Sequence, residues 1–302
     1  MAQDTTTRSD APATSSGTVN EVFVGLIWLG VTMWTAHAMI TGNADDVSGT
    51  LGAAAAALPG VISATLLTGA SIGHTASSRF QGAGRRLLAG LAAGTFFGLA
   101  AAAGIRFAYG MESSITVLAV IVGAASVLGG AAAILPDPVL GAGLWATTWV
   151  FFAGVIFGVL PPQLTLLLGG GGAADPAAQA AASIRSIFVQ SALTGLLAGV
   201  YAFRSLSGER RAWLWYSLAG ALPGLLLLAA VGLTRLGGAS VLNLVDGFSP
   251  GQPALAEFTD FASLRHALIV LAVGGVVAMI AAVRTLGRSA DDPADSSSSD
   301  DD

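Results

Sequence analysis

The sequence predicts an all-α membrane protein, a polytopic bundle of about eight transmembrane helices. Hydrophobic residues make up 54% of the 302 residues and charged residues only 10%, whereas a water-soluble chain carries roughly 25% charged residues. Most of the charges lie outside eight apolar stretches. Each stretch holds about 20 residues, which as a helix crosses the ~30 Å hydrocarbon core of a bilayer. Lipid rather than water is therefore expected around the bundle.

The predicted helices follow one another through the central part of the chain. Between the fourth and the fifth, two prolines in the segment Leu135–Pro138 cannot continue a helix, and Asp137 favours water. We therefore predict two helices joined by a tight turn there. The eight expected helices cover residues 21–41, 51–77, 86–105, 115–135, 140–160, 183–204, 213–235 and 265–286.

Polar tails flank this single transmembrane domain, which we place at residues 21–286. Residues 1–20 and 287–302 are predicted to be disordered and cytoplasmic, because neither can bury enough apolar surface to order itself. The first apolar stretch lacks a basic segment before it and is long enough to span, so it is not expected to be a cleaved signal peptide. Six aspartates lie in the last twelve residues, and without them the net charge of −5 becomes +1.

Composition excludes several classes of function. The chain has no cysteine, so it holds no disulfide, thiolate nucleophile or Cys-ligated metal, and we expect no cofactor. All 13 basic residues are arginine. A Lys-free, Asp-tailed, Ala/Gly-rich chain resembles the proteins of halophilic archaea; a GC-rich genome and an acidic tail explain the same pattern. No basic patch is present to bind nucleic acid.

Three groups of arginines predict the orientation of the bundle. In an alternating eight-helix topology they share one side, which the positive-inside rule assigns to the cytoplasm. Both termini are therefore expected to be cytoplasmic, in a protein of the plasma membrane. The three groups are Arg79, Arg85 and Arg86; Arg204, Arg210 and Arg211; and Arg284 and Arg288.

Glycines at four-residue spacing predict how the helices pack. Gly90, Gly94 and Gly98 lie on one face of the third helix. In lipid, small residues promote helix association because they let two backbones approach closely. The triple predicts that these glycines pack against a neighbour and that the third helix is central.

A short repeat suggests a substrate site. Ala57 to Gly60 in the second helix recur as Ala221 to Gly224 in the seventh. Because these helices run in opposite directions, the match would relate two groups of three helices as a 3+3 inverted repeat, an architecture of many secondary transporters. Chance similarity in an Ala/Gly/Leu-rich chain is the alternative. The candidate substrate-binding residues are Pro59, Gly60, Pro223 and Gly224.

The outer side of the bundle offers a candidate polar cluster. Two histidines and three arginines are expected near helix ends there, where they could bind an anion or respond to pH. Alternatively, they are interfacial residues whose side chains reach water. Their spacing is not that of metal ligands. The five residues are His37, Arg106, Arg235, Arg265 and His266.

Residues 69–74 read G-A-S-I-G-H. The run is similar to the GxSG serine motif of rhomboid intramembrane proteases, although Ile72 stands where their glycine follows the serine. The resemblance implies an intramembrane serine hydrolase with Ser71 as nucleophile. However, His266 is expected at the opposite side of the membrane, and His74 lies one turn away on the same helix. Geometry argues against a catalytic dyad, and we do not expect an enzyme.

The sequence therefore favours a permease-like protein that binds or moves a small solute. The first alternative is a non-catalytic membrane subunit that anchors a partner, and the second is the serine hydrolase. The expected partners are the lipid bilayer and either another membrane protein or further copies of the chain.

Overall fold

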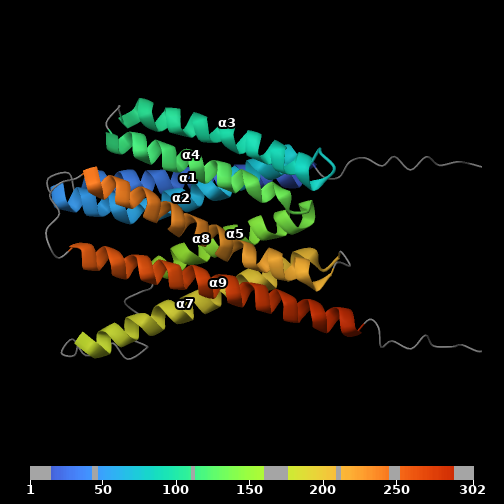
Figure 1. The fold of residues 1–302 in the computed structure, drawn as a ribbon. Helices are drawn as coiled ribbons and strands as arrows, with labels where there is room; N and C mark the ends of the chain where they lie inside the picture. Colours follow the sequence, from blue (N-terminus) through green and yellow to red (C-terminus); the bar gives the residue numbers. More distant parts are fainter. Residues whose placement is uncertain are drawn as a thin grey trace, which may run out of the picture.

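A computed structural model describes residues 15–42, 47–109, 113–159, 176–208, 212–244 and 252–288. Within these ranges the chain is all-helical, with eight α-helices, one short 3-10 helix and no strand, so the predicted fold class is confirmed (Figure 1). The α-helices are α1 (Ser15–Gly42), α2 (Val47–Ser77), α3 (Ala83–Tyr109), α4 (Ser113–Ala131), α5 (Asp137–Val159), α7 (Pro176–Leu206), α8 (Trp213–Leu244) and α9 (Gln252–Arg288).

The helices overlap the eight predicted stretches, and several extend beyond them. Seven are long and apolar enough to cross a membrane. The exception among the described residues is α2, whose second half is rich in glycine, serine and threonine. The predicted turn lies between α4 and α5, where the 3-10 helix η1 (Ala132–Ile134) ends before Pro136. Pro138 then occupies the first turn of α5. Backbone N–H groups of the first turn have no partner within the helix, so the missing N–H of proline costs no hydrogen bond.

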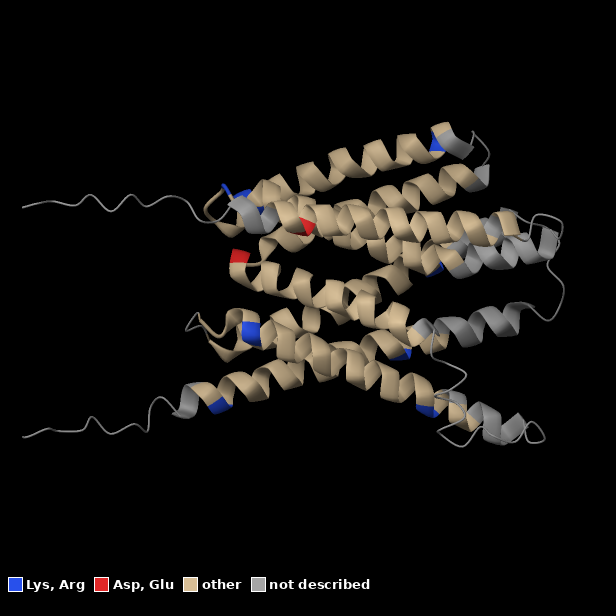
Figure 2. Cartoon of the chain, turned by 180° about the vertical axis from the view of Figure 1, so that it is seen from behind, with Lys and Arg blue, Asp and Glu red and all other residues tan. Residues whose placement is uncertain are grey.

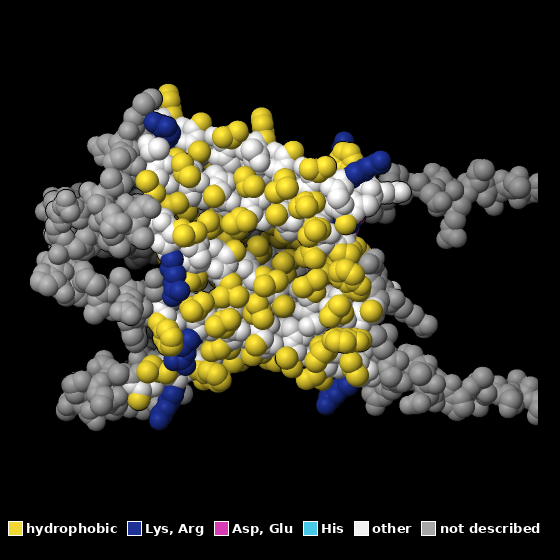
Figure 3. Space-filling view, viewed as in Figure 1, with side chains coloured by type: hydrophobic (Ala, Val, Ile, Leu, Met, Phe, Trp, Pro, Cys, Tyr) yellow, Lys and Arg dark blue, Asp and Glu magenta, His cyan; other side chains and the backbone are white. Residues whose placement is uncertain are grey.

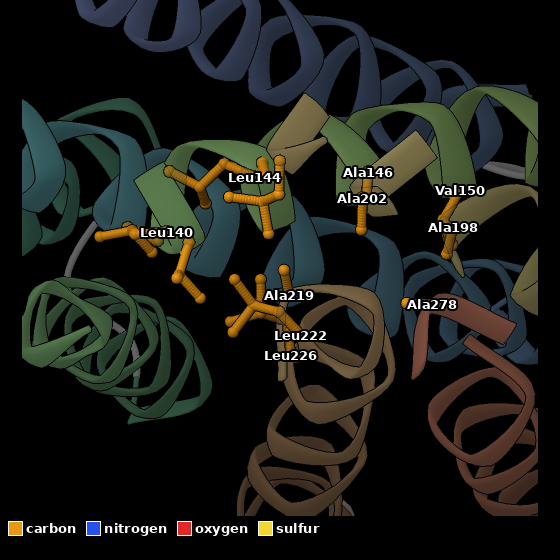
Figure 4. Close-up of a cluster of buried hydrophobic side chains, with 14 of the residues drawn as sticks. Leu140, Leu144, Ala146, Val150, Ala198, Ala202, Ala219, Leu222, Leu226 and Ala278 are labelled. Carbon is orange, nitrogen blue, oxygen red and sulfur yellow. The ribbon is translucent and has the colours of Figure 1, made fainter. Parts of the chain in front are cut away.

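The helices form two groups that pack side by side (Figure 1). In the first group, α2 and α4 contact each other, α1 packs on α2, and α3 packs on both α2 and α4. The second group contains α5, α7, α8 and α9. It supplies most of the buried side chains of the largest apolar core among the described residues, which also includes Leu67 and Ala70 of α2 (Figure 4). Contacts of α8 with α2 and α4, and of α5 with α1 and α2, join the groups.

The outside of the bundle is apolar, as a lipid-facing surface must be. Large hydrophobic side chains are widely exposed, among them Phe107 at 96% and Phe96 at 79%. On the face drawn in Figure 3, hydrophobic side chains cover the middle, whereas Lys and Arg colouring appears toward the two ends. Such exposure would be unfavourable in water, and it indicates a multi-pass membrane protein.

The helix α3 is not central, contrary to the prediction from its glycines. It contacts α2, α4 and η1 and lies at the edge of the bundle (Figure 1). Its glycine face meets α4: a Cβ atom added to Gly94 would lie 2.7 Å from the carbonyl oxygen of Ser126, and one added to Gly98 would lie 2.8 Å from that of Gly123. Glycines at this spacing report a close approach to one neighbour, which an edge helix can also have.

Candidate functional site

Four charged or titratable side chains meet at the end of the bundle where α1 begins and α9 ends, here called the terminal end. Glu21 comes from α1, His74 from α2, Arg86 from α3 and Asp137 from α5. Glu21 and Asp137 are the acidic residues whose side chains the structure describes, and the acidic colouring in Figure 2 lies at this end. Four helices thus contribute to one ionic network.

His74 is the centre of the network. Its Nδ1 atom lies 2.7 Å from Oε2 of Glu21, at hydrogen-bond distance, and its Nε2 atom lies 3.8 Å from Oδ1 of Asp137. The Nη2 atom of Arg86 pairs with the same Oδ1 atom. The imidazole ring therefore stands between two carboxylates, one of which is also held by a guanidinium group.

Burial differs sharply along the network. The side chains of His74 and Glu21 are 5% and 8% exposed, and that of Arg86 is 11% exposed, whereas that of Asp137 is 43% exposed. Removing a charge from water is costly unless it is paired and hydrogen-bonded. The network satisfies this condition for the inner pair, and its outer member remains in reach of solvent.

Local structure brings these residues together. His74 lies in the last turn of α2 and Asp137 in the first turn of α5, positions where the helix dipole favours a cation and an anion respectively. Gly141, one turn after Asp137, makes room for the inner pair. A Cβ atom at Gly141 would lie 3.3 Å from both Glu21 Oε1 and His74 Cε1.

The network contains a histidine and two carboxyl groups, all of which are chemically able to carry a proton. Two carboxylates and one guanidinium leave a net charge of −1 when His74 is neutral, and protonation of the imidazole brings the total to zero. Nδ1 of His74 lies at hydrogen-bond distance from a carboxylate oxygen, and Nε2 lies 3.8 Å from a second one, which is too far for a hydrogen bond in this conformation. Within the described residues, no three His, Asp or Glu side chains are arranged to hold a metal ion.

The predicted substrate-binding residues lie elsewhere, in unlike surroundings. Both α2 and α8 continue as helices through Pro59 and Pro223. A Cβ atom at Gly60 would meet nothing within 4 Å, whereas one at Gly224 would overlap the backbone of Leu271 on α9. The two Pro-Gly pairs are therefore not equivalent positions in the fold, and neither interrupts its helix.

The five residues of the predicted outer cluster are spread over helices that do not pack as one group. The helix α1, which carries His37, packs on α2 and α5, and α3, which carries Arg106, packs on α2 and α4. The other three lie on α8 and α9. There Arg265 stacks over Phe261, with 6.0 Å between its Cζ atom and the ring centroid, and Nδ1 of His266 lies 2.7 Å from Oγ of Ser191.

Ser71 is not paired with a histidine. It is 1% exposed, and its hydroxyl donates to the carbonyl oxygen of Leu67, one turn earlier on α2. His74 instead faces the two carboxylates. Ser191 does contact His266, yet its hydroxyl also donates to Ile187 O at 2.6 Å, and the side chain is fully buried.

Two hollows of the described surface are open grooves. One, of about 390 Å³, lies between α7 and α9 beside Arg284, and the other, of about 460 Å³, lies between α1 and α2 beside Arg79. Neither is lined by a residue of the ionic network. The buried members of the network, Glu21, His74 and Arg86, therefore lie within packed helices rather than in a groove, and Asp137 is the exposed member.

Sequence reasoning did not find the network, because each member had an ordinary interpretation of its own. Arg86 belonged to an arginine group that orients the bundle, and Asp137 to a turn. The predicted topology nevertheless indicates that the four residues share one side of the membrane, since all of them fall at predicted cytoplasmic helix ends. No protein-family model, curated protein or solved structure matches this chain.

Proposed function

We propose that the protein is a proton-linked permease of the plasma membrane for a small solute, with the ionic network as its proton site. The observation that carries the proposal is the buried Glu21–His74 pair, at 2.7 Å, inside a membrane bundle. Ionisable side chains buried in membrane proteins are costly, and they commonly mark proton or substrate pathways.

The gradient of burial supports a proton route. Asp137 is the exposed member, His74 is the buried intermediate, and Glu21 is the inner acceptor. A proton that enters at Asp137 has an imidazole nitrogen as its next acceptor, 3.8 Å away, and a carboxylate beyond the ring. Small rotations of these side chains would complete the transfer.

A non-catalytic membrane subunit is the second candidate, favoured by the packing of the bundle. Glycine contacts close α3 onto α4 and α8 onto α9, and the two hollows described above are open to the outside. A subunit that only anchors a partner needs no internal pathway. Serine hydrolysis has less support, because the hydroxyl of Ser71 donates a hydrogen bond to a carbonyl oxygen of its own helix.

Cysteine accessibility separates the two candidates, and the native chain has no cysteine to interfere. Single cysteines would replace Ser71, Thr147 and Leu222, which are buried. In proteoliposomes, a permease must expose some of them to a polar thiol reagent from one side when a pH gradient is imposed. Protection from both sides at every position, with and without the gradient, would contradict the permease and favour the subunit.

The role of the proton site has its own test. In the same vesicles, Glu21→Gln should abolish the gradient-dependent change in labelling, because the amide cannot take up the proton. Arg79→Gln is the matched control, since Arg79 is exposed at the same end of the bundle and outside the network. Equal labelling of the Glu21→Gln variant and the parent would remove the network from the mechanism.

A further inference from the structure

A second internal sequence repeat, at a different spacing, relates the two helix groups to each other. Residues of α2 and α3 recur in α7 and α8 at an offset of 126 positions without a gap, as from Gly69 to Gly195. Between residues 67 and 103, the identical pairs are Leu67/Leu193, Thr68/Thr194, Gly69/Gly195, Gly73/Gly199, Ala76/Ala202, Gly82/Gly208, Arg85/Arg211, Leu88/Leu214, Ala93/Ala219, Gly94/Gly220, Gly98/Gly224, Leu99/Leu225 and Ala103/Ala229.

The matched glycines also make matched contacts. In the first group, Cβ atoms at Gly73 and Gly94 would lie 2.9 and 3.3 Å from Cα of Gly130 on α4. In the second group, Cβ atoms at the partners Gly199 and Gly220 would both meet the carbonyl oxygen of Gly274 on α9. In each group, one glycine of the last helix, Gly130 of α4 or Gly274 of α9, is thus held between two glycines of the two preceding helices.

The order of helix contacts repeats as well. If α1, α2, α3 and α4 correspond to α5, α7, α8 and α9, then each packed pair in the first group has a packed counterpart in the second. The spacing between Gly130 and Gly274 is 144 rather than 126. Most of the difference arises before α9, because α8 and the connection that follows it are longer than their counterparts, α3 and the connection to α4. The rest arises because Gly274 lies farther along α9 than Gly130 does along α4.

The ionic network does not follow this duplication. At the same offset, Val200 stands in place of His74 and Ala212 in place of Arg86. Asp137 begins α5 and therefore belongs to the second unit, whereas Glu21, His74 and Arg86 belong to the first. The contacts of Asp137 with Arg86 and His74 consequently cross from one unit to the other.

We infer that the bundle is a tandem duplication of a four-helix unit, and that Asp137, held by Arg86 and His74, is an ionic latch between the units at the terminal end. Apolar contacts also cross the interface in the described part of the chain. Trp28 stacks on Phe151 with ring centroids 5.9 Å apart, and Ile62 and Leu66 pack in one cluster with Leu233. Two apolar surfaces in lipid can move relative to each other without breaking any ionic contact. Release of the latch would therefore let the units separate at the terminal end.

Both a permease and an anchoring subunit could contain this latch, so its test measures distance instead of transport. Spin labels on cysteines at Ser78 and Ser207 would report the separation of the units, because both residues are exposed at the terminal end, one in each unit. In full-length protein in lipid, Asp137→Asn and Arg86→Gln should each add a longer-distance population. Arg79→Gln should leave the distribution unchanged.

The alternatives give distinct results. Distributions identical to the parent in both Asp137→Asn and Arg86→Gln would overturn the latch, and so would an equal shift in Arg79→Gln, which would indicate a general effect of charge. Arg86→Lys, which keeps the charge, should restore the short distance and guards against loss of folding in Arg86→Gln. Failure of Arg86→Lys to restore it in a monodisperse, helical protein would also contradict the proposal.

Discussion

The Nδ1 atom of His74 lies 2.7 Å from Oε2 of Glu21, although the two residues are separated by 53 positions and belong to different helices. Both side chains are almost fully buried, at 5% and 8% exposure. A buried polar pair of this kind stabilises the fold only while both partners are present. It therefore ties the stability of the α1–α2 contact to the proposed proton site.

Glu21→Ala should destabilise the protein by about 1–3 kcal/mol, because it leaves a buried imidazole nitrogen without its partner. Glu21→Gln keeps a hydrogen-bonding group at the same place and should lose less. Thermal unfolding in detergent, followed by helical circular dichroism, measures both. If the alanine variant is as stable as the glutamine variant, the hydrogen bond contributes little.

Gly94→Leu should weaken the contact of α3 with α4. The side chain would start 2.7 Å from Ser126 O, and overpacking of this kind typically costs about 1–3 kcal/mol. Gly104→Leu is the matched control on the same helix, because a Cβ atom there meets nothing within 4 Å. Comparison of unfolding midpoints tests the difference, and equal midpoints would count against the α3–α4 interface described above.

Gly224→Ala and Gly60→Ala should change the thermal stability of the protein in opposite directions. The alanine methyl group at position 224 meets the backbone of Leu271, so that variant should unfold at a lower temperature. At position 60 the space is open, and alanine is favoured over glycine within a helix by about 1 kcal/mol. Equal effects of the two substitutions would revive the inverted repeat that the Pro-Gly pairs suggested.

The sequence was sufficient to predict the helices, because the thickness of a bilayer fixes how long an apolar segment must be. It was also sufficient to predict that Gly94 meets a neighbour, since four-residue spacing places small residues on one face. The position of α3 at the edge was not predictable in this way. A glycine face shows how closely two helices approach, but says nothing of how many others surround them.

The ionic network could be predicted only in part. Alternation of the helices assigns Glu21, His74, Arg86 and Asp137 to one end of the bundle, yet that end also carries Arg79 and Arg284, which lie outside the network. Which charges are buried depends on how helices distant in the sequence pack. The room that Gly141 leaves beside Glu21 and His74 becomes visible only in three dimensions.

The central claim, that an ionic contact between Arg86 and Asp137 joins the two groups of helices, is most directly tested by a double-mutant cycle. Arg86→Gln, Asp137→Asn and the double variant would be compared with the parent by thermal unfolding in one detergent. Residues in direct contact show non-additive effects, and with Asp137 partly exposed to solvent we expect a coupling of about 1 kcal/mol. The double variant should then be at least as stable as the less stable of the two single variants. Strictly additive losses would contradict the contact.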